Sequence, residues 1–173
     1  MFGVEDGVVQ NMTLIVGMIG AALSNRIIVI AAAINAIAGV LSMSMGTYLS
    51  SKAERDVAVA ARDGSDRPST DPEPRAPIRS PRRDTFVMAE AYALGAFIPL
   101  LPFVGGSLNQ AVALALAVIL AGLTLFFLGA GKAALSNQSR IRSGLEMLIL
   151  ASAAGLAGYL LGVVARAVFG LEV

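Results

Sequence analysis

The sequence GVVQNMTLIVGMIGAALSNRIIVIAAAINAIAGVLSMSMGTYLSS, residues 7–51, contains one charged residue, Arg26. Arg26 separates two uncharged runs of 19 and 25 residues. Because about 20 apolar residues in a helix cross the hydrocarbon core of a bilayer, each run is long enough to span a membrane. The stretch therefore predicts a transmembrane hairpin with a tight turn at residues 24–26.

The composition of the whole chain agrees with a membrane location. Hydrophobic residues make up 56% of the 173 residues and charged residues 14%, whereas soluble domains average about 45–50% and about 25%. The chain has no Cys and no His, which excludes disulfides, Cys/His zinc sites, haem ligation and imidazole catalysis. The basic residues form no stripe that would indicate nucleic-acid binding. No combination of nucleophile, base and orienting group indicates an enzyme.

Uncharged runs further along the chain predict three more spans. Residues 91–131 form an uncharged run that is too long for one helix, and the Pro- and Gly-containing segment 102–107 is its natural break. The expected fold is an all-α integral membrane protein with five transmembrane helices, at about residues 4–23, 27–51, 84–103, 108–131 and 143–168.

Lys and Arg residues predict how these helices are oriented. Segment 52–83 carries eight of the 13 basic residues, and segment 132–142 carries three. By the positive-inside rule both segments and the N-terminus face the cytoplasm, and the C-terminus lies outside or in a lumen. We divide the chain into a transmembrane hairpin (1–51), a disordered Pro- and Arg-rich cytoplasmic linker (52–83) and the remaining transmembrane helices (84–173).

Polar residues inside the predicted hairpin indicate a functional surface. Asp6 and Gln10 share one face of the first helix, and Asn35, Ser42 and Met43 lie on one broad face of the second. A carboxylate at the centre of a bilayer costs about 2.5–3.5 kcal/mol on insertion scales, so it requires a partner or a function. We expect these two helix faces to contact each other or to line a pathway rather than to face lipid.

A carboxylate combined with a thioether would favour a borderline divalent cation. Asp6 and Met43 together suit ferrous iron, although manganese remains open. The structural alternative for Met43 and Met45 is ordinary packing. The corresponding alternative for Asp6 is that it stabilises the helix N-terminus at the head-group level.

Two glutamates fall within predicted spans near their cytoplasmic ends. Glu90 has no residue of opposite charge three or four positions away, so it is a candidate for proton exchange or for receiving metal from the cytoplasm. Glu146 is a second candidate for these roles. The structural alternative for Glu146 is an ion pair with Arg142, four residues earlier on the same helix.

Several segments of the chain resemble the vacuolar iron transporter family. The segment from Asp6-Gly7 through Gly20 and GVLSMSMGTYLSSK (39–52) are similar to the first two helices of that family. GAFIPLLPF (95–103) resembles its third helix, and RSGLE (142–146) resembles the start of its fifth. Apart from the linker, the resemblance covers nearly the whole chain.

The resemblance implies a five-helix protomer that works as a homodimer and moves Fe²⁺, and often Mn²⁺, out of the cytosol in exchange for protons. It places Asp6 and Met43 as metal ligands on a path between protomers. From their positions in the predicted hairpin, we expect Gln10, Asn35, Ser42 and Met45 to line that path. The implied partners are the metal, protons and the lipid bilayer, and no cofactor is implied. We expect a multi-pass protein of the prokaryotic inner membrane.

The chain departs from the family at two places that bear on transport. Eukaryotic relatives carry a glutamate eight residues before the methionine, where this chain has Asn35, an amide that cannot exchange a proton. Well-known relatives also place a Glu- and Met-rich metal-binding domain between helices 2 and 3, where this chain has its Pro-rich segment. An alternative function is therefore a non-transporting membrane anchor or partner module of an iron-handling system, and transport of a different solute is a third.

Overall fold

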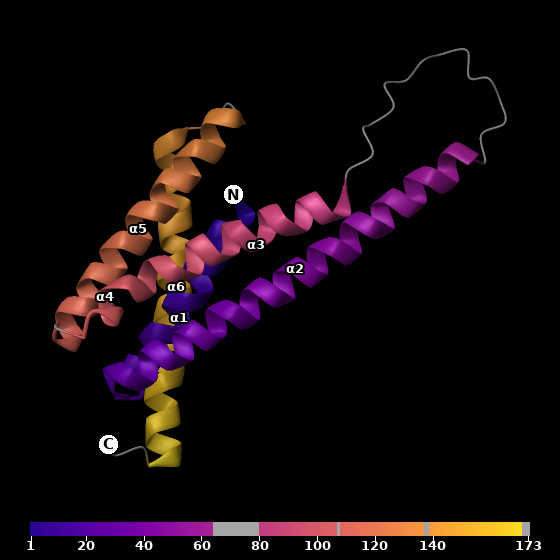
Figure 1. The fold of residues 1–173 in the computed structure, drawn as a ribbon. Coiled ribbons are helices and arrows are strands. Elements are labelled where there is room, and N and C mark those ends of the chain that lie inside the picture. The colour runs from indigo at the N-terminus through magenta and orange to yellow at the C-terminus, as the bar shows by residue number, and fades with distance from the viewer. Residues whose placement is uncertain (64–79, 107, 137–138, 171–173) are drawn as a thin grey trace.

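The protein folds into a bundle of helices in the computed structural model (Figure 1), which describes residues 1–63, 80–106, 108–136 and 139–170. Residues 21–24 join α1 to α2, and α3, η1 and α4 follow one another without a break. The elements in chain order are α1 (Phe2–Gly20), α2 (Asn25–Asp63), α3 (Pro81–Phe97), η1 (Ile98–Leu100), α4 (Leu101–Val104), α5 (Gln110–Leu135) and α6 (Arg140–Phe169).

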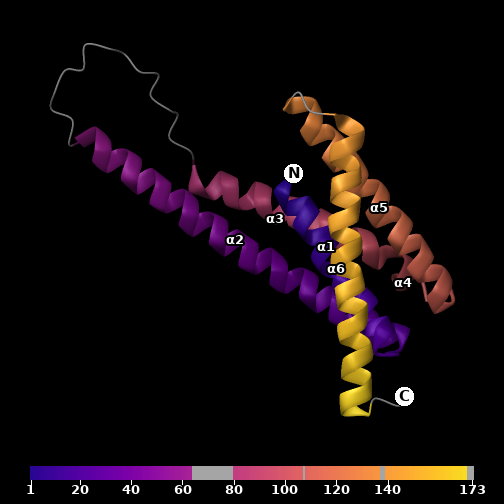
Figure 2. The same ribbon diagram turned by 180° about the vertical axis from the view of Figure 1, so that it is seen from behind.

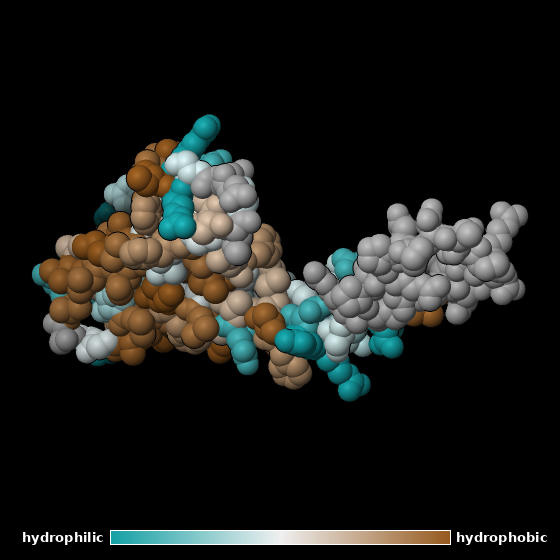
Figure 3. Space-filling view, turned by 90° about the horizontal axis from the view of Figure 1, so that it is seen from above, coloured by the Kyte–Doolittle hydropathy of each residue, from teal (hydrophilic) through white to brown (hydrophobic). Residues whose placement is uncertain are grey.

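Four segments are long and apolar enough to cross a membrane: Asn25–Ala60, Pro81–Val104, Gln110–Ala134 and Arg140–Phe169. Apolar residues cover most of the bundle on the face drawn in Figure 3. The protein is therefore a multi-pass membrane protein. The 19-residue α1 is not among these four segments, so the count of five spans and the orientation of the termini remain predictions.

Helix α1 lies at the centre of the bundle. It packs along α3 and α6 and also contacts α2 and α5. At a rise of about 1.5 Å per residue its length approaches the thickness of the hydrocarbon core. Figures 1 and 2 show that the start of α1 and the end of α6 lie at opposite ends of the bundle. Because protein covers several sides of α1, this helix can carry more polar residues than a helix that faces lipid.

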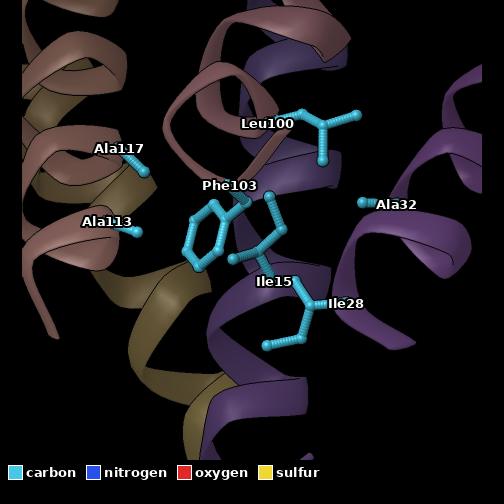
Figure 4. Close-up of a cluster of buried hydrophobic side chains, with 7 residues drawn as sticks. All are labelled: Ile15, Ile28, Ala32, Leu100, Phe103, Ala113 and Ala117. Atoms are coloured by element: carbon cyan, nitrogen blue, oxygen red, sulfur yellow. The ribbon is translucent and has the colours of Figure 1, made fainter. Parts of the chain in front are cut away.

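Three clusters of buried apolar side chains connect the helices around α1. The first joins α1, α2, η1, α4 and α5 (Figure 4) and contains Ile15, Ile28, Ala32, Leu100, Phe103, Ala113 and Ala117. The second joins α1, α5 and α6 through Val8, Ala121, Leu125 and Met147. The third joins α2 to α3 through Ala36, Tyr92 and Ala96. Because lipid is as apolar as these side chains, tight packing rather than removal from water holds the clusters together.

Glycines allow α1 and α6 to approach closely. A Cβ atom on Gly158 would lie 2.6 Å from the carbonyl oxygen of Thr13, and one on Gly162 would overlap the carbonyl oxygen of Gly17. The small-residue face that contains Gly158 and Gly162 is therefore a helix-packing face, as such residues usually are in membranes.

Helix α2 extends well beyond the expected end at residue 51. It runs to Asp63, so the prediction of a disordered linker was wrong for residues 52–63. Segment KAERDVAVAARD (52–63) is rich in Ala, Arg, Lys and Glu, which favour helix, and it lacks Pro and Gly. Helix α3 likewise starts at Pro81, three residues before the expected start. Segment 64–79 of the predicted linker lies outside the described residues.

The third predicted helix, 84–103, is divided into three elements. Helix α3 ends at Phe97, a 3₁₀ turn carries Pro99, and the short α4 carries Pro102. Proline lacks the amide hydrogen of a regular helix and clashes with the preceding turn, so each one ends the helical segment before it. The divided segment places Leu100 and Phe103 in the first core cluster.

The glycine contact between α1 and α6 predicts the effect of one added methyl group. Gly162→Ala should lower the midpoint of thermal unfolding, because its Cβ needs the space occupied by the Gly17 carbonyl group. The matched control is Gly155→Ala on the same helix, where nothing lies within 4 Å of the added Cβ. That control should be neutral or stabilising by up to about 1 kcal/mol, because Ala favours helix over Gly. Equal melting temperatures for the two variants in detergent would contradict the packing described.

Candidate functional site

Asp6 lies in a pocket between α1, α5 and α6. The pocket has a volume of about 170 Å³, and its lining includes Glu5, Asp6 and Met147. Both carboxylates are half-buried, and Met147 is 9% exposed. Val9 and Leu125 form part of its apolar wall. Two acidic residues and one methionine therefore line a single pocket.

This donor set has a definite chemical preference. Carboxylate oxygens bind hard divalent cations, and a thioether sulfur adds affinity for softer ones, so the pocket suits a borderline ion. Within the described residues, no three Asp or Glu side chains come together in a metal-binding arrangement. A metal at Asp6 would therefore need sulfur, amide or backbone oxygen, water or a second copy of the chain to complete its coordination.

A chain of hydrogen bonds connects α1, α2 and α3, beginning one turn after Asp6 along α1. The Tyr92 hydroxyl donates to Gln10 Oε1 at 2.6 Å, and Gln10 Nε2 donates to Asn35 Oδ1 at 3.5 Å. Asn35 Nδ2 then donates to Asn11 Oδ1 at 3.2 Å. Finally, Asn11 Nδ2 donates to the carbonyl oxygen of Ala96 at 2.6 Å. The four bonds all run in the same direction, from donor to acceptor.

Burial explains why this chain forms. Asn11 is fully buried, and a buried amide without partners costs about 1–3 kcal/mol in proteins. Tyr92 is also fully buried, and its hydroxyl lies so close to Gly39 that a Cβ atom there would overlap it. Asn35 both donates and accepts within the chain. Its amide is therefore part of the packing between helices as well as a candidate pathway residue.

Met43 lies in different surroundings from Asp6. It is half-buried and packs against the cluster of Ala36, Tyr92 and Ala96. Within one protomer the two predicted metal ligands thus belong to different contact groups, the Asp6 pocket and the α2–α3 cluster. Tyr92 connects the two groups, because it belongs to the cluster that Met43 packs against and its hydroxyl donates to Gln10, one helical turn from Asp6.

Other predicted pathway residues lie at the surface of the protomer. Gln10, Ser42 and Met45 are exposed, and Met45 is 66% exposed. For Gln10 and Ser42 this is unusual, because polar side chains are seldom left facing lipid.

The two predicted glutamate sites are also exposed, Glu90 on α3 and Glu146 on α6. Glu146 shares a pocket at the start of α6 with Arg142, Ser139 and Ser143. Glu146 and Arg142 thus line one space, and the ion pair between them stays a prediction. Neither glutamate lines the Asp6 pocket.

The sequence analysis did not single out Glu5, Asn11, Tyr92 or Met147. Glu5 and Asn11 each stand next to a predicted site residue, and a full count of polar side chains in the first run would have included them. Tyr92 and Met147 carried no local signal. Tyr92 is 82 positions from its partner Gln10, and their contact depends on the packing of three helices.

The hydrogen-bond chain predicts a measurable contribution to stability from the Tyr92 hydroxyl. Tyr92→Phe should lower the free energy of unfolding by about 1 kcal/mol, within the range of hydrogen bonds between membrane helices. Tyr159→Phe is the matched control, because Tyr159 on α6 is 43% exposed. A Tyr92 variant as stable as the Tyr159 variant, measured by reversible unfolding in detergent, would show that this bond contributes nothing.

Comparison with known proteins gives a consistent result. The profile of the VIT family matches residues 1–74 and 65–163. Vacuolar iron transporter homolog 1 of Oryza sativa subsp. japonica is 32% identical over 154 residues, covering 86% of this chain and 65% of the relative. Vacuolar iron transporter homolog 5 of the same organism is 28% identical over 149 residues, covering 86% and 70%. Vacuolar iron transporter 1 of Arabidopsis thaliana is 25% identical over 214 residues, covering 96% and 84%.

These matches confirm the resemblance found in the sequence. They extend over both membrane segments of the chain rather than over one motif. Members of the family are transporters, not enzymes. The chain belongs to the VIT family.

Proposed function

We propose that this protein transports a divalent metal ion, Fe²⁺, across the membrane. The observation that carries the proposal is the half-buried carboxylate of Asp6, which lines a pocket with a second carboxylate and a thioether. The names of the relatives, which are iron transporters and their homologs, support iron as the substrate. Mn²⁺ is the second candidate substrate, because carboxylate oxygens suit it equally well.

Asp6 and Met43 are the proposed metal ligands, as the family resemblance implies. Met147 is an alternative source of sulfur, because it lines the same pocket as Asp6. Glu5 lines this pocket too and would attract a cation to it. The two thioethers can be distinguished experimentally, since Met43 belongs to α2 and Met147 to α6.

The proposed path lies between two copies of the chain. Gln10 and Ser42 are polar and exposed on helices that contain long uncharged runs. Contact with a second copy would remove them from lipid and bring two Asp6 carboxylates toward one path. A homodimer would thus supply the additional ligands that a site within one protomer does not provide.

Proton exchange is the proposed driving reaction for export from the cytosol. Protonation of Asp6 would remove the charge that holds the metal and would release it. Asn35 cannot take part in proton exchange, since its amide side chain is not titratable. Glu90 and Glu146 are exposed outside the Asp6 pocket, so they are the weaker candidates for this role.

The membrane in which the protein works is a separate matter from its reaction. The sequence analysis expected a prokaryotic inner membrane, but the relatives reported above are plant proteins named for the vacuole. They give no support to that expectation, and the proposed reaction does not depend on it.

The alternative function is a membrane anchor or partner module that does not transport. Asn35 favours it, because this amide has a structural role in the hydrogen-bond chain and lacks the charge of a coupling residue. Metal binding without flux would distinguish the anchor from the transporter.

Transport of Fe²⁺ into proteoliposomes tests the assignment of the ligands. Asp6→Asn should reduce the initial rate of transport by at least tenfold, because it removes the negative charge while the side chain keeps nearly the same shape. Met43→Leu should raise the metal concentration needed for half-maximal rate. Met147→Leu serves as the matched variant. If it raises this concentration more than Met43→Leu does, the sulfur ligand is Met147 on α6 and not Met43 on α2. Measurement at two internal pH values also tests proton exchange.

Wild-type rates from Asp6→Asn, in vesicles that contain equal amounts of folded protein, would refute the proposed site. A flux of Fe²⁺ that does not depend on the pH gradient would refute proton exchange but not metal transport. Binding of Fe²⁺ by the wild type without any flux would favour the anchor.

The proposed dimer can be tested by disulfide cross-linking, because the chain contains no cysteine. Ser42→Cys should form a covalent dimer in membranes on mild oxidation, since this exposed position faces the proposed partner. Leu123→Cys on α5 is the control, because Leu123 is 51% exposed and lies on a different helix. Equal cross-linking of both variants, or none from Ser42→Cys, would argue against this interface.

A further inference from the structure

A second polar pocket lies where the end of α2 meets the start of α3. It has a volume of about 360 Å³, and its lining includes Tyr48, Lys52, Arg55, Asp56, Ser80 and Arg82. This volume lies within the range of small-molecule sites, about 300–1,000 Å³. The metal site proposed above uses none of these residues.

The charge of this pocket favours an anion. Lys52, Arg55 and Arg82 contribute three positive charges, and Asp56 contributes one negative charge. Asp84, in the first turn of α3, does not line the pocket, and its carboxylate accepts a hydrogen bond from Ser51 at 3.2 Å. The lining side chains therefore carry a net charge of two positive units.

The start of α3 adds to this preference. Ser80 precedes the helix and makes no capping hydrogen bond with its side chain. The first-turn amide groups of a helix carry a partial positive charge. Here that charge reinforces two arginines and a lysine, whose guanidinium and ammonium groups are the usual partners of phosphate.

The position of the pocket distinguishes a lipid from a soluble anion. The uncharged run of α2 ends at Ser51, immediately before Lys52. Within two turns toward the membrane, α2 exposes Met45 and Leu49, and α3 exposes Phe86 and Val87 just past its first turn. Tyr48 lines the pocket and belongs to the residue types that concentrate at membrane interfaces. Cations thus stand directly beside apolar surface on both helices.

From this arrangement we infer that the pocket binds the phosphate of an anionic phospholipid head group. Basic pockets between transmembrane helices on the cytoplasmic side bind such head groups, and the distribution of Lys and Arg predicts that this end of the bundle faces the cytoplasm. The bound phosphate would join the end of α2 to the start of α3. The acyl chains would lie along the exposed Phe86 and Val87 of α3. The inference depends on membrane insertion and not on transport.

Thermal unfolding in mixed micelles tests the lipid site. Adding phosphatidylglycerol should raise the unfolding temperature of the wild type by several degrees, whereas phosphatidylcholine should not, because a ligand that binds only the folded state stabilises it. K52Q/R55Q/R82Q should lose most of this shift. The matched control is K132Q/R140Q/R142Q, which removes the same charge from the other basic segment and should keep the shift.

Three results would overturn the inference. One is equal loss of the shift in both triple variants, which would indicate general surface attraction. A second is an equal shift from inorganic phosphate, which would make the ligand a soluble anion. The third is an unchanged shift in K52Q/R55Q/R82Q. If that variant does not fold, R82Q alone is compared with R140Q, and native mass spectrometry counts the phosphatidylglycerol bound to each.

Discussion

The close approach of α1 to α3 and α6 is the constraint on which the rest of the structure depends. In water a buried helix is held by removal of apolar surface from solvent, but that force is largely absent between helices in lipid. Glycines provide the alternative, because they bring backbone atoms into contact over a short distance. Gly7 on α1 faces the backbone of Tyr92 and Ala96, while Gly158 on α6 faces Thr13. With protein on several sides, α1 can keep polar side chains that a lipid-facing helix could not.

This central position accounts for the composition of α1. Glu5, Asp6, Gln10 and Asn11 lie within two turns of one another on a helix that is otherwise apolar. The structure gives each pair a different environment. The two carboxylates line the pocket against α5 and α6, and the two amides bond with α2 and α3. Asp6 nevertheless shares a helix face with Gln10, so the pocket and the hydrogen-bond chain adjoin each other along α1.

The sequence predicted the main helices well because their signals are local. Uncharged runs of membrane-spanning length and the breaks between them can be counted along the chain, and α5 and α6 begin within three residues of the expected starts. The extension of α2 to Asp63 was missed because the prediction of disorder covered the whole segment 52–83, whereas its prolines all lie after residue 63. Helix propensity over 52–63 contained the correct information. The role of Tyr92 had no such signal, because it arises from contacts between segments far apart in sequence.

The hydrogen-bond chain also indicates where the bundle is least tightly joined. Its two ends, from Tyr92 to Gln10 and from Asn11 to Ala96, measure 2.6 Å and both join α1 to α3. Its two middle bonds, at 3.5 and 3.2 Å, join α1 to α2 through Asn35. Longer hydrogen bonds are weaker, so this chain of bonds holds α2 to α1 less firmly than it holds α3 to α1. Because Asn35 is neutral, breaking its bonds leaves no unpaired charge in the membrane. An amide at this position therefore gives α2 a contact with α1 that is specific in geometry and free of charge, although opening it leaves the fully buried Asn11 Oδ1 without its partner.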